Sequence, residues 1–190
     1  MNVNVLLISG SLRAQSTNSA ALRTAVELAA DGMTTTLYDG LGELPHFNPD
    51  DDAEAVVPQP AVAELRRAVA DADAILICTP EYAGALPGAL KNLLEWTIGD
   101  AGTHQKPIGW INVSGPAAPT GGADAHDSLR KVLQYAHADI VDAACVRVPL
   151  ERGMVGDDGL VSDEQARAGI ARALEELARH VAARGVSADA

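Results

Sequence analysis

Short apolar runs recur along the chain, and between them the apolar residues follow a different spacing. Five runs are rich in β-branched and aliphatic residues, as expected of β-strands. They span residues 3–9, 33–38, 74–79, 108–114 and 140–148. The run at 74–79 is continuously apolar and predicts a central strand, whereas the threonines at 33–38 predict an outer one.

The segments between these runs carry apolar residues every three or four positions, the spacing of a helix face that packs on a core. Five such stripes predict five helices. Their apolar positions are Leu22, Val26 and Ala29; Val62, Leu65, Val69 and Ala72; Leu90, Leu93, Leu94 and Ile98; Leu129, Val132 and Leu133; and Ile170, Leu174, Leu177 and Val181. Glycines predict helix ends near Gly32, Gly99 and Gly185. Strict alternation predicts one α/β domain over residues 1–190, with a parallel sheet and helices on both faces.

Two stretches depart from this regular pattern. Residues 39–60 hold four prolines and the acidic run 50–52, which predicts a long surface connection with a solvated acidic tip. A lid or a contact with a partner is the alternative for a connection of this length. Asp142 interrupts the fifth apolar run, so we expect that strand to start late.

Three unusual loops follow the predicted first, third and fourth strands. They are the first loop (residues 9–18), the second loop (residues 79–88) and the third loop (residues 114–122). Open parallel sheets bind ligands outside the carboxyl ends of their strands. We therefore expect the three loops to surround one site.

The first loop joins a strand to the start of a helix and predicts a phosphate-binding site. Gly10 suits a tight turn. The loop's polar side chains are four neutral hydrogen-bond donors and the charged guanidinium of an arginine. They are Ser11, Arg13, Ser16, Thr17 and Asn18. At a helix start the backbone N–H groups lack partners and the dipole favours an anion. The loop has neither GxGxxG nor GxxxxGK[ST], so one terminal phosphate fits better than a pyrophosphate or triphosphate. The alternative is that residues 16–18 only cap the helix.

Prolines and small residues stiffen the second loop. Pro80 and Pro87 restrict the backbone, Ala83-Gly84 removes side-chain bulk, and Tyr82 is one of only three tyrosines. A stiff loop with exposed amides suits the edge of a flat heteroaromatic ring, although it is also typical of a plain turn before a helix. The third loop is placed to line the far side of the same ring.

The composition narrows the class of partner. The chain has 190 residues and a net charge of −12, which argues against nucleic acid and anionic membranes as partners. The N-terminus enters the first strand without a leader-like segment, and Cys78 and Cys145 lie in apolar runs, so we expect a cytoplasmic protein with buried, reduced thiols. The five histidines lack ligand spacing, so we expect no metal site.

The first and second loops carry two motifs, Gly10-Ser11-Leu12-Arg13-x-x-Ser16-x-Asn18 and Thr79-Pro80-Glu81-Tyr82. A leucine-rich helix start at 86–96 continues the second motif. These motifs resemble the phosphate loop and the flavin-ring loop of the NAD(P)H-dependent FMN reductases of the flavodoxin-like superfamily, which include quinone, chromate and azo-dye reductases. The resemblance runs from Val3 to about Val148.

The resemblance implies a flavodoxin-like three-layer sandwich whose five-stranded parallel sheet has the order 2-1-3-4-5. It implies an oxidoreductase in which NADPH or NADH gives a hydride to bound FMN, and a quinone-like or other oxidised acceptor, or free flavin, then takes the electrons. No catalytic side chain is needed, because the flavin carries the chemistry. The resemblance also implies a homodimer or homotetramer.

The same resemblance assigns roles to the loop residues. Those that would hold the FMN phosphate are Ser11, Arg13, Ser16, Thr17 and Asn18. Those that would surround the flavin ring are Pro80, Glu81, Tyr82 and Ala83, with Ser114 and Gly115 facing it. Ala83 stands where many relatives have asparagine, which leaves only a backbone donor there. Residues 123–126 stand where a basic residue is common, which leaves the choice between NADPH and NADH open.

Two other functions use the same architecture. A non-enzymatic electron carrier of the flavodoxin type would bind FMN without a nicotinamide site. A receiver-type domain needs clustered acidic residues at the ends of the first and third strands, where this chain has Ser9 and Thr79. The long loops and the Thr79-Pro80-Glu81-Tyr82 motif favour the reductase.

Overall fold

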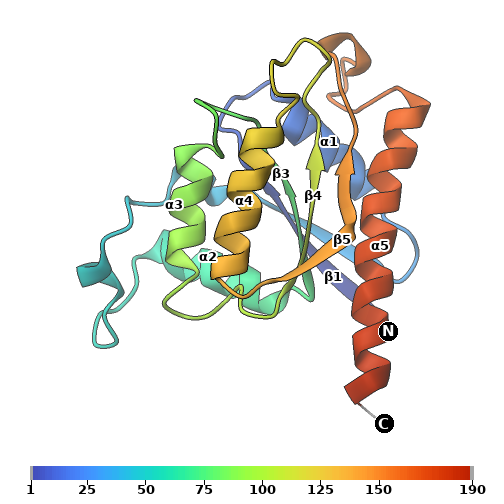
Figure 1. The fold of residues 1–190 in the computed structure, drawn as a ribbon. Helices are drawn as coiled ribbons and strands as arrows, with labels where there is room; N and C mark the ends of the chain where they lie inside the picture. Colours follow the sequence, from blue (N-terminus) through green and yellow to red (C-terminus); the bar gives the residue numbers. More distant parts are fainter. Residues whose placement is uncertain (1, 189–190) are drawn as a thin grey trace.

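A computed structural model describes residues 2–188, so Met1 and the last two residues of the predicted 1–190 domain lie outside the described residues. Strands and helices alternate along the chain (Figure 1). The strands are β1 (Val3–Ser9), β2 (Met33–Tyr38), β3 (Ala74–Cys78), β4 (Pro107–Asn112) and β5 (Asp139–Arg147). The helices are α1 (Thr17–Glu27), α2 (Pro60–Asp71), α3 (Gly88–Trp96), α4 (Ala123–Tyr135) and α5 (Glu164–Ala188). Three short 3₁₀ helices, η1 (Gly40–Gly42), η2 (Pro49–Asp52) and η3 (Arg152–Met154), lie in the connections.

The five strands form one parallel sheet in the order β2-β1-β3-β4-β5, which confirms the predicted topology. β3 lies at the centre with all five residues buried, and β2 lies at an edge with alternating exposure, as the sequence predicted. Ser9 pairs with Cys78, and Cys78 pairs with Ile111, so β1, β3 and β4 end at the same level. The loops that follow these strands therefore start side by side.

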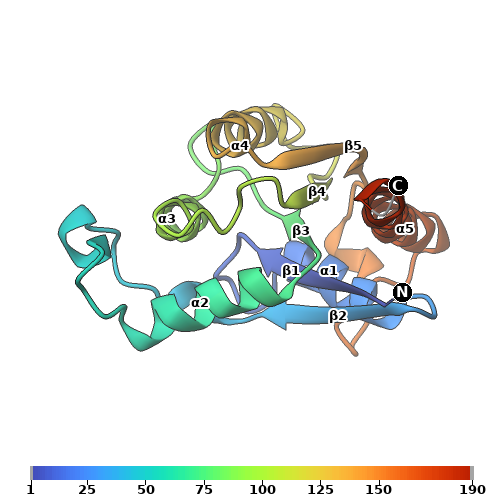
Figure 2. The ribbon, with the colours of Figure 1, turned by 90° about the horizontal axis from the view of Figure 1, so that it is seen from below.

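Helices cover both faces of the sheet (Figures 1 and 2). α1 and α5 pack on one face, in a core cluster that includes Leu22 and Leu174. α2, α3 and α4 pack on the other face, in a cluster that includes Leu65 and Leu90. Alternate residues of β1 enter the two clusters, because successive side chains of a strand point to opposite faces. Trp96 and Trp110 are buried in the second cluster.

Helix α1 ends earlier than the sequence predicted. It ends at Glu27, where the N–H of Leu28 donates to the carbonyl of Thr24 at 3.0 Å, and Val26 is 40% exposed although it was expected on the apolar stripe. Gly32 lies in the turn before β2, with φ of 84°. The chain must leave the helix early because Met33 has to pair with Val3 at the start of β1.

Two other helix ends differ from the prediction. Ile98 lies beyond the end of α3 and is 43% exposed, so it is not part of the core stripe. α5 continues past Gly185 to Ala188. A glycine near the end of a long helix is tolerated because it costs only about 1 kcal/mol relative to alanine.

The long connection between β2 and α2 carries η2 away from the body of the molecule (Figure 1). Its base is fixed by the carbonyl of Pro45, which accepts hydrogen bonds from the side chains of Asn92 and Trp96 at 2.9 Å each. The prediction of a fully solvated acidic tip was wrong for Asp52, whose largely buried carboxylate forms an ion pair with Arg66. Asp50 and Asp51 are exposed, as predicted.

Strand β5 begins at Asp139 rather than late, which corrects the expectation based on Asp142. The register with β4 shifts between Ile108 and Trp110, and this irregularity accommodates extra residues of β5. The exposed Asp142 forms an ion pair with Arg130 at 2.7 Å, and the Arg130 guanidinium lies 4.9 Å from the centre of the Trp110 ring. A charged residue is thus tolerated inside the strand because the bulge places it on the surface.

Candidate functional site

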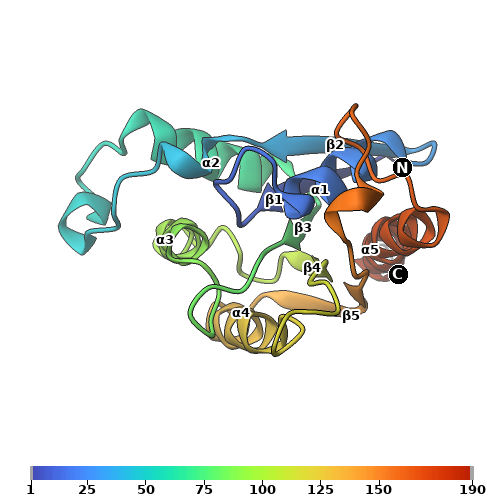
Figure 3. The same ribbon diagram turned by 90° about the horizontal axis from the view of Figure 1, so that it is seen from above.

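The three loops meet at the carboxyl edge of the sheet, which Figure 3 shows from above. The N–H of Gly10 donates to the carbonyl of Cys78 at 2.9 Å. A Cβ atom at Gly10 would lie 2.1 Å from Oγ1 of Thr79, so the first and second loops touch with no room for a side chain. The φ of Gly10 is not positive, so this close approach, rather than the tight turn the sequence suggested, requires glycine.

Serine hydroxyl groups shape the first loop around the start of α1. Ser16 is the N-cap residue, and its Oγ accepts from the N–H of Asn18 at 3.2 Å. The Oγ of Ser11 accepts from the N–H of Arg13 at 3.3 Å. Within residues 2–188 the N–H groups of Ser16 and Thr17 have no protein acceptor. The cap and an anion site are therefore compatible, because the cap uses one donor and leaves others free.

Arg13 is exposed and its side chain turns back onto its own loop. Its Nη2 donates to the carbonyl of Gln15 at 2.8 Å, and no carboxylate pairs with it among the described residues. The guanidinium keeps further N–H donors for an anion at the loop.

Asn18 lies inside the loop rather than at its open surface. Its side chain is buried, Oδ1 accepts from Sγ of Cys78 at 3.4 Å, and Nδ2 donates to Oγ of Ser16 at 3.4 Å. Burial raises the pKa of the Cys78 thiol well above its usual range, which keeps the thiol protonated as the donor. Asn18 thus ties the helix start to β3.

The second loop folds into a tight turn at its tip. Tyr82 and Ala85 exchange two backbone hydrogen bonds of 3.0 and 3.1 Å. The two residues between them, Ala83 and Gly84, both have positive φ, 52° and 71°. This is the backbone of a type I′ turn, in which asparagine followed by glycine is favoured. The turn leaves the Tyr82 side chain 52% exposed at the edge of the site.

Glu81 joins the second loop to the third. Its Oε2 accepts from Oγ1 of Thr120 at 2.6 Å and from the N–H of Ala125 at 3.3 Å. The carboxylate lies at the N-terminal end of α4, where the helix dipole favours a negative charge. Glu81 therefore fixes the spacing of the two loops, a role that the sequence did not reveal because Thr120 is 39 positions away.

Asn112 and two glycines shape the third loop. Oδ1 of Asn112 accepts from the N–H of Ser114 at 2.9 Å, and its Nδ2 donates to the carbonyl of Gly121 at 2.8 Å. Gly122 has φ of 78°, and a Cβ there would lie 2.4 Å from Oγ of Ser114. Ser114 and Gly115 are partly exposed at the start of this loop, and Pro80 is half-buried in the second loop.

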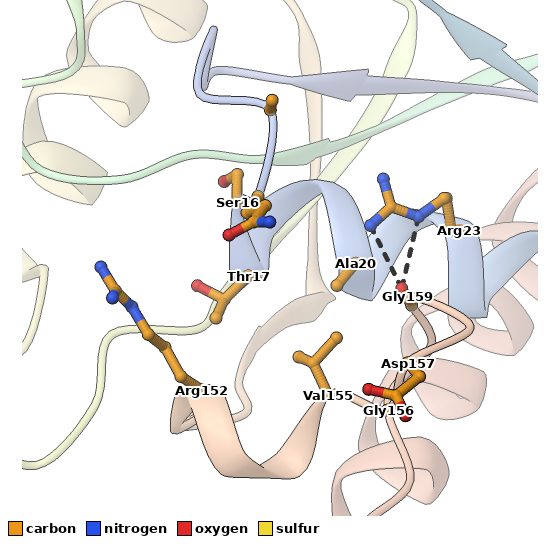
Figure 4. A pocket seen from close by; sticks show the side chains of 11 residues that line it. Ser16, Thr17, Ala20, Arg23, Arg152, Val155, Gly156, Asp157 and Gly159 are labelled. Atoms are coloured by element: carbon orange, nitrogen blue, oxygen red, sulfur yellow. Dashed lines mark hydrogen bonds between the residues drawn. The ribbon is translucent and has the colours of Figure 1, made fainter.

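Two arginines of this edge were not predicted from the sequence. Arg147 ends β5 opposite Asn112, and its guanidinium lies against Gly121 of the third loop. Arg152 begins η3 and lines a cavity beside Ser16 and Thr17 (Figure 4). Neither forms an ion pair with a described residue. Arg147 is the last residue of the fifth strand and Arg152 lies in the loop after it, and neither position carries a motif, so only the folded chain brings them to the site.

His126 is a buried ionisable group of α4. Its ring stacks on Trp110 with 6.0 Å between centroids, and both ring nitrogens lack a hydrogen-bond partner in the described structure. Burial lowers its pKa to about 4, an effect that the charges of Asp127 and Glu81 oppose. The ring is therefore neutral near pH 7.

The described residues offer no other obvious chemistry. Between residues 2 and 188, no group of three or more His, Cys, Asp or Glu side chains is placed to hold a metal ion. Each helix described for residues 2–188 is too short or too polar to span a lipid bilayer. Cys78 and Cys145 are free thiols; Cys78 is buried as predicted, but Cys145 is only half-buried. Burial raises the pKa of Cys145 to about 11.

The sheet order and the three loops at its carboxyl edge define a flavodoxin-like protein. FerB of Paracoccus denitrificans, a flavoenzyme NAD(P)H:(acceptor) oxidoreductase, superposes with a TM-score of 0.73 and 25% sequence identity, over 94% of this chain and 98% of its own. The likeness therefore extends over nearly the whole of both proteins.

Sequence comparison identifies the family. The profile of the NADPH-dependent FMN reductases matches residues 3–151. An NAD(P)H-dependent FMN reductase of Pseudomonas aeruginosa is 34% identical over 178 residues, 93% of this chain and 94% of that protein. A quinone reductase of Pseudomonas putida is 32% identical over 149 residues, 77% of this chain and 75% of that protein. The chain belongs to the NADPH-dependent FMN reductase family and is an FMN-dependent NAD(P)H oxidoreductase.

Proposed function

We propose that one flavodoxin-like domain holds FMN at the three loops, with the phosphate in the first loop and the ring between the second and third. The observation that carries this proposal is the free N–H groups of Ser16 and Thr17 at the start of α1, beside the exposed Arg13. An anion placed there meets unpaired donors, the helix dipole and a guanidinium together. The residues present therefore fit a single terminal phosphate.

Some side chains of the site are proposed to contact FMN, and others hold the loops in place through contacts inside the protein. Ser11, Arg13, Ser16 and Thr17 are proposed to bind the phosphate, while Asn18 holds the helix start on β3 from its buried position. Pro80, Tyr82 and Ala83 are proposed to border the ring, with Ser114 and Gly115 facing it. Glu81 sets the distance between the loops through Thr120 and Ala125.

Bound FMN supplies the redox chemistry by accepting a hydride from NAD(P)H and passing electrons to the acceptor. The chain's own contribution is to position and enclose the ring, for which the stiff second loop and the Glu81 contacts are suited. We propose a quinone-type acceptor, which the quinone reductase of Pseudomonas putida and the 2-hydroxy-1,4-benzoquinone reductase of a Burkholderia species support by their names.

The test of the proposed site compares FMN with riboflavin, which lacks the phosphate. We expect the apoprotein to bind FMN more tightly than riboflavin, and Arg13→Ala to weaken FMN binding about tenfold to hundredfold, the loss of one charged hydrogen bond. Riboflavin binding should stay unchanged. Arg172→Ala, which removes an exposed arginine of α5, is the matched control and should bind FMN as the wild type does.

Equal affinity of the wild type for riboflavin and FMN would show that the phosphate is not held in the first loop. Anaerobic NADPH or NADH should bleach the flavin of the wild type, and a quinone should restore the colour. FMN binding without bleaching would instead favour the electron carrier.

We also propose that the protein works in the cytoplasm, because its free thiols support a reducing compartment.

We further propose a homo-oligomer, for which an apolar groove between α3 and α4 offers a surface. The groove has a volume of about 590 Å³ and is lined by Leu94, Ile98 and Tyr135 among others, and Tyr135 is 81% exposed. Lys91, Lys131 and Glu95 border the same groove. Because the border carries both signs of charge, a second copy related by a two-fold axis can pair acid with base across it.

A further inference from the structure

Arg152 and the start of α1 line the same cavity, which lies between α1 and the segment that joins β5 to α5 (Figure 4). The cavity has a volume of about 340 Å³. Ser16 and Thr17, whose free N–H groups are proposed to hold the FMN phosphate, line its wall on α1. Arg152 lines the wall on η3, and its side chain reaches from η3 towards the start of α1 (Figure 4). An anion bound at the free N–H groups therefore shares the cavity with this arginine.

The guanidinium of Arg152 keeps its N–H donors for a ligand. Within residues 2–188 it donates no hydrogen bond and forms no ion pair. Arg23, the second arginine that lines the cavity, differs because its Nε and Nη2 donate to the carbonyl of Gly159 at 3.3 and 3.1 Å. Arg23 thus holds the segment after η3 on α1, whereas the donors of Arg152 remain for an anion.

The backbone on both sides of Arg152 is fixed by the rest of the protein. The N–H of Leu150 donates to the carbonyl of Val113 at 3.1 Å, and the Leu150 side chain is buried in the core. On the other side, the N–H of Ser162 donates to the carbonyl of Met154 at 2.9 Å. η3 is therefore held in place before a ligand binds, which lowers the entropy cost of a contact with its arginine.

Electrostatics favours a second arginine at the phosphate. A phosphate monoester such as that of FMN carries about 1.5 to 2 negative charges near pH 7, as phosphoserine does. Arg13 supplies one positive charge, while the net charge of −12 on the whole chain repels an anion. Arg152 also lies near the positive end of the α1 dipole, which disfavours an arginine there unless an anion lies between them. A bound phosphate removes this repulsion and gains a second charged partner.

The acidic residue that lines the cavity lies away from this end. Asp157 lies near Gly159, whereas Arg152 reaches towards Thr17 (Figure 4). We propose that Arg152 binds the phosphate of FMN together with Arg13, from a segment outside the three loops. This inference rests on the proposed function. The phosphate site then has donors from the first loop on one side and from η3 on the other.

The test compares the affinities of the apoprotein for FMN and for riboflavin, measured by the change in flavin fluorescence on binding. Arg152→Ala should weaken FMN binding about tenfold to hundredfold, the loss of one charged hydrogen bond, and leave riboflavin binding unchanged. Arg172→Ala makes the same change of charge on α5, and it should bind both flavins as the wild type does. A defect in folding would instead weaken the binding of both flavins.

Three results would overturn the inference while a preference of the wild type for FMN, reduced in Arg13→Ala, leaves the proposed function standing. Arg152→Ala binds FMN as the wild type does; Arg152→Ala weakens FMN and riboflavin equally, which would indicate a structural role; or Arg172→Ala weakens FMN binding as much, which would indicate only a change in overall charge. A wild type that does not prefer FMN to riboflavin would overturn the proposed phosphate site, and the inference with it.

Discussion

At Gly10 the first loop packs directly against Thr79 of the second loop. The sequence predicted that Gly10 serves a tight turn. The structure shows that glycine is required because Oγ1 of Thr79, 69 positions away, occupies the space that a Cβ would need. Asn18 and Glu81 are two further residues whose contacts a local sequence pattern does not reveal. Both were predicted to contact the cofactor, and both make contacts inside the protein that no local pattern reveals.

Gly10→Ala should destabilise the protein. The added methyl group would overlap the buried Thr79 side chain, and overpacking of this kind costs about 1–3 kcal/mol. Urea denaturation measures the change in the free energy of unfolding. Gly88→Ala is the matched control, because nothing lies within 4 Å of its added Cβ, and it should be neutral or stabilise α3 by about 0.5–1 kcal/mol. Equal effects of the two substitutions would contradict the contact.

His126 should make the protein less stable in acid. Its pKa falls from 6.5 in the unfolded chain to about 4 in the folded one because the ring is buried. Between these two values the unfolded state binds more protons, so stability falls as the pH falls from about 6.5 to 4, by about 3 kcal/mol in total.

The measurement for His126 is the free energy of unfolding of the wild type and of His126→Phe at several pH values. The phenylalanine variant keeps an aromatic ring against Trp110 and removes the titrating group. The difference between the two proteins should grow on acidification and reach a plateau below pH 4. A difference that does not depend on pH would exclude this role for His126.

At the scale of elements, apolar spacing predicted all five strands and all five helices, and most errors fell at their ends. α1 stops at Glu27 because β2 has to pair with the start of β1, a constraint that lies outside the helix. β5 tolerates Asp142 because a register shift in the sheet places it on the surface beside Arg130. Element ends are thus decided by neighbours in space, which a local pattern does not contain.

The turn at the tip of the second loop should gain stability from Ala83→Asn. Alanine with a positive φ costs about 1 kcal/mol, and asparagine accepts this backbone conformation more readily. A higher midpoint of thermal unfolding is the expected result. Ala85→Asn changes the same turn at a position without positive φ and should bring no gain. A gain at Ala85 equal to that at Ala83 would show that the backbone conformation is not the cause.

At the scale of the whole molecule, the parallel sheet gathers loops from separate parts of the chain at one edge. The three loops were predicted to meet there because carboxyl ends of parallel strands share an edge, and the contacts of Gly10 and Glu81 confirm that they do. Arg147 and Arg152 join them from the end of β5 without a motif to mark them. They raise the positive charge of this edge in a chain whose net charge is −12.

The apolar groove between α3 and α4 should determine the oligomeric state. We expect the wild type to sediment as a dimer or tetramer and Tyr135→Glu to shift it towards the monomer, because a charge in an apolar interface loses its hydration. Val26→Glu places the same charge on an exposed apolar residue of α1, outside the groove, and should leave the state unchanged. A monomeric wild type at micromolar concentration would contradict the proposed oligomer.

The sequence by itself determined the alternation of strands and helices, the central place of the 74–79 strand and the loops that carry the phosphate and ring motifs. These features are local, because apolar periodicity and turn residues act within a few positions of the chain. The tertiary structure alone decided where the elements end, that Asn18 faces the core, that Glu81 links two loops, and that Arg152 lies beside the start of α1. Each of these depends on atoms brought together by the order of strands in the sheet, and that order joins residues far apart in the sequence.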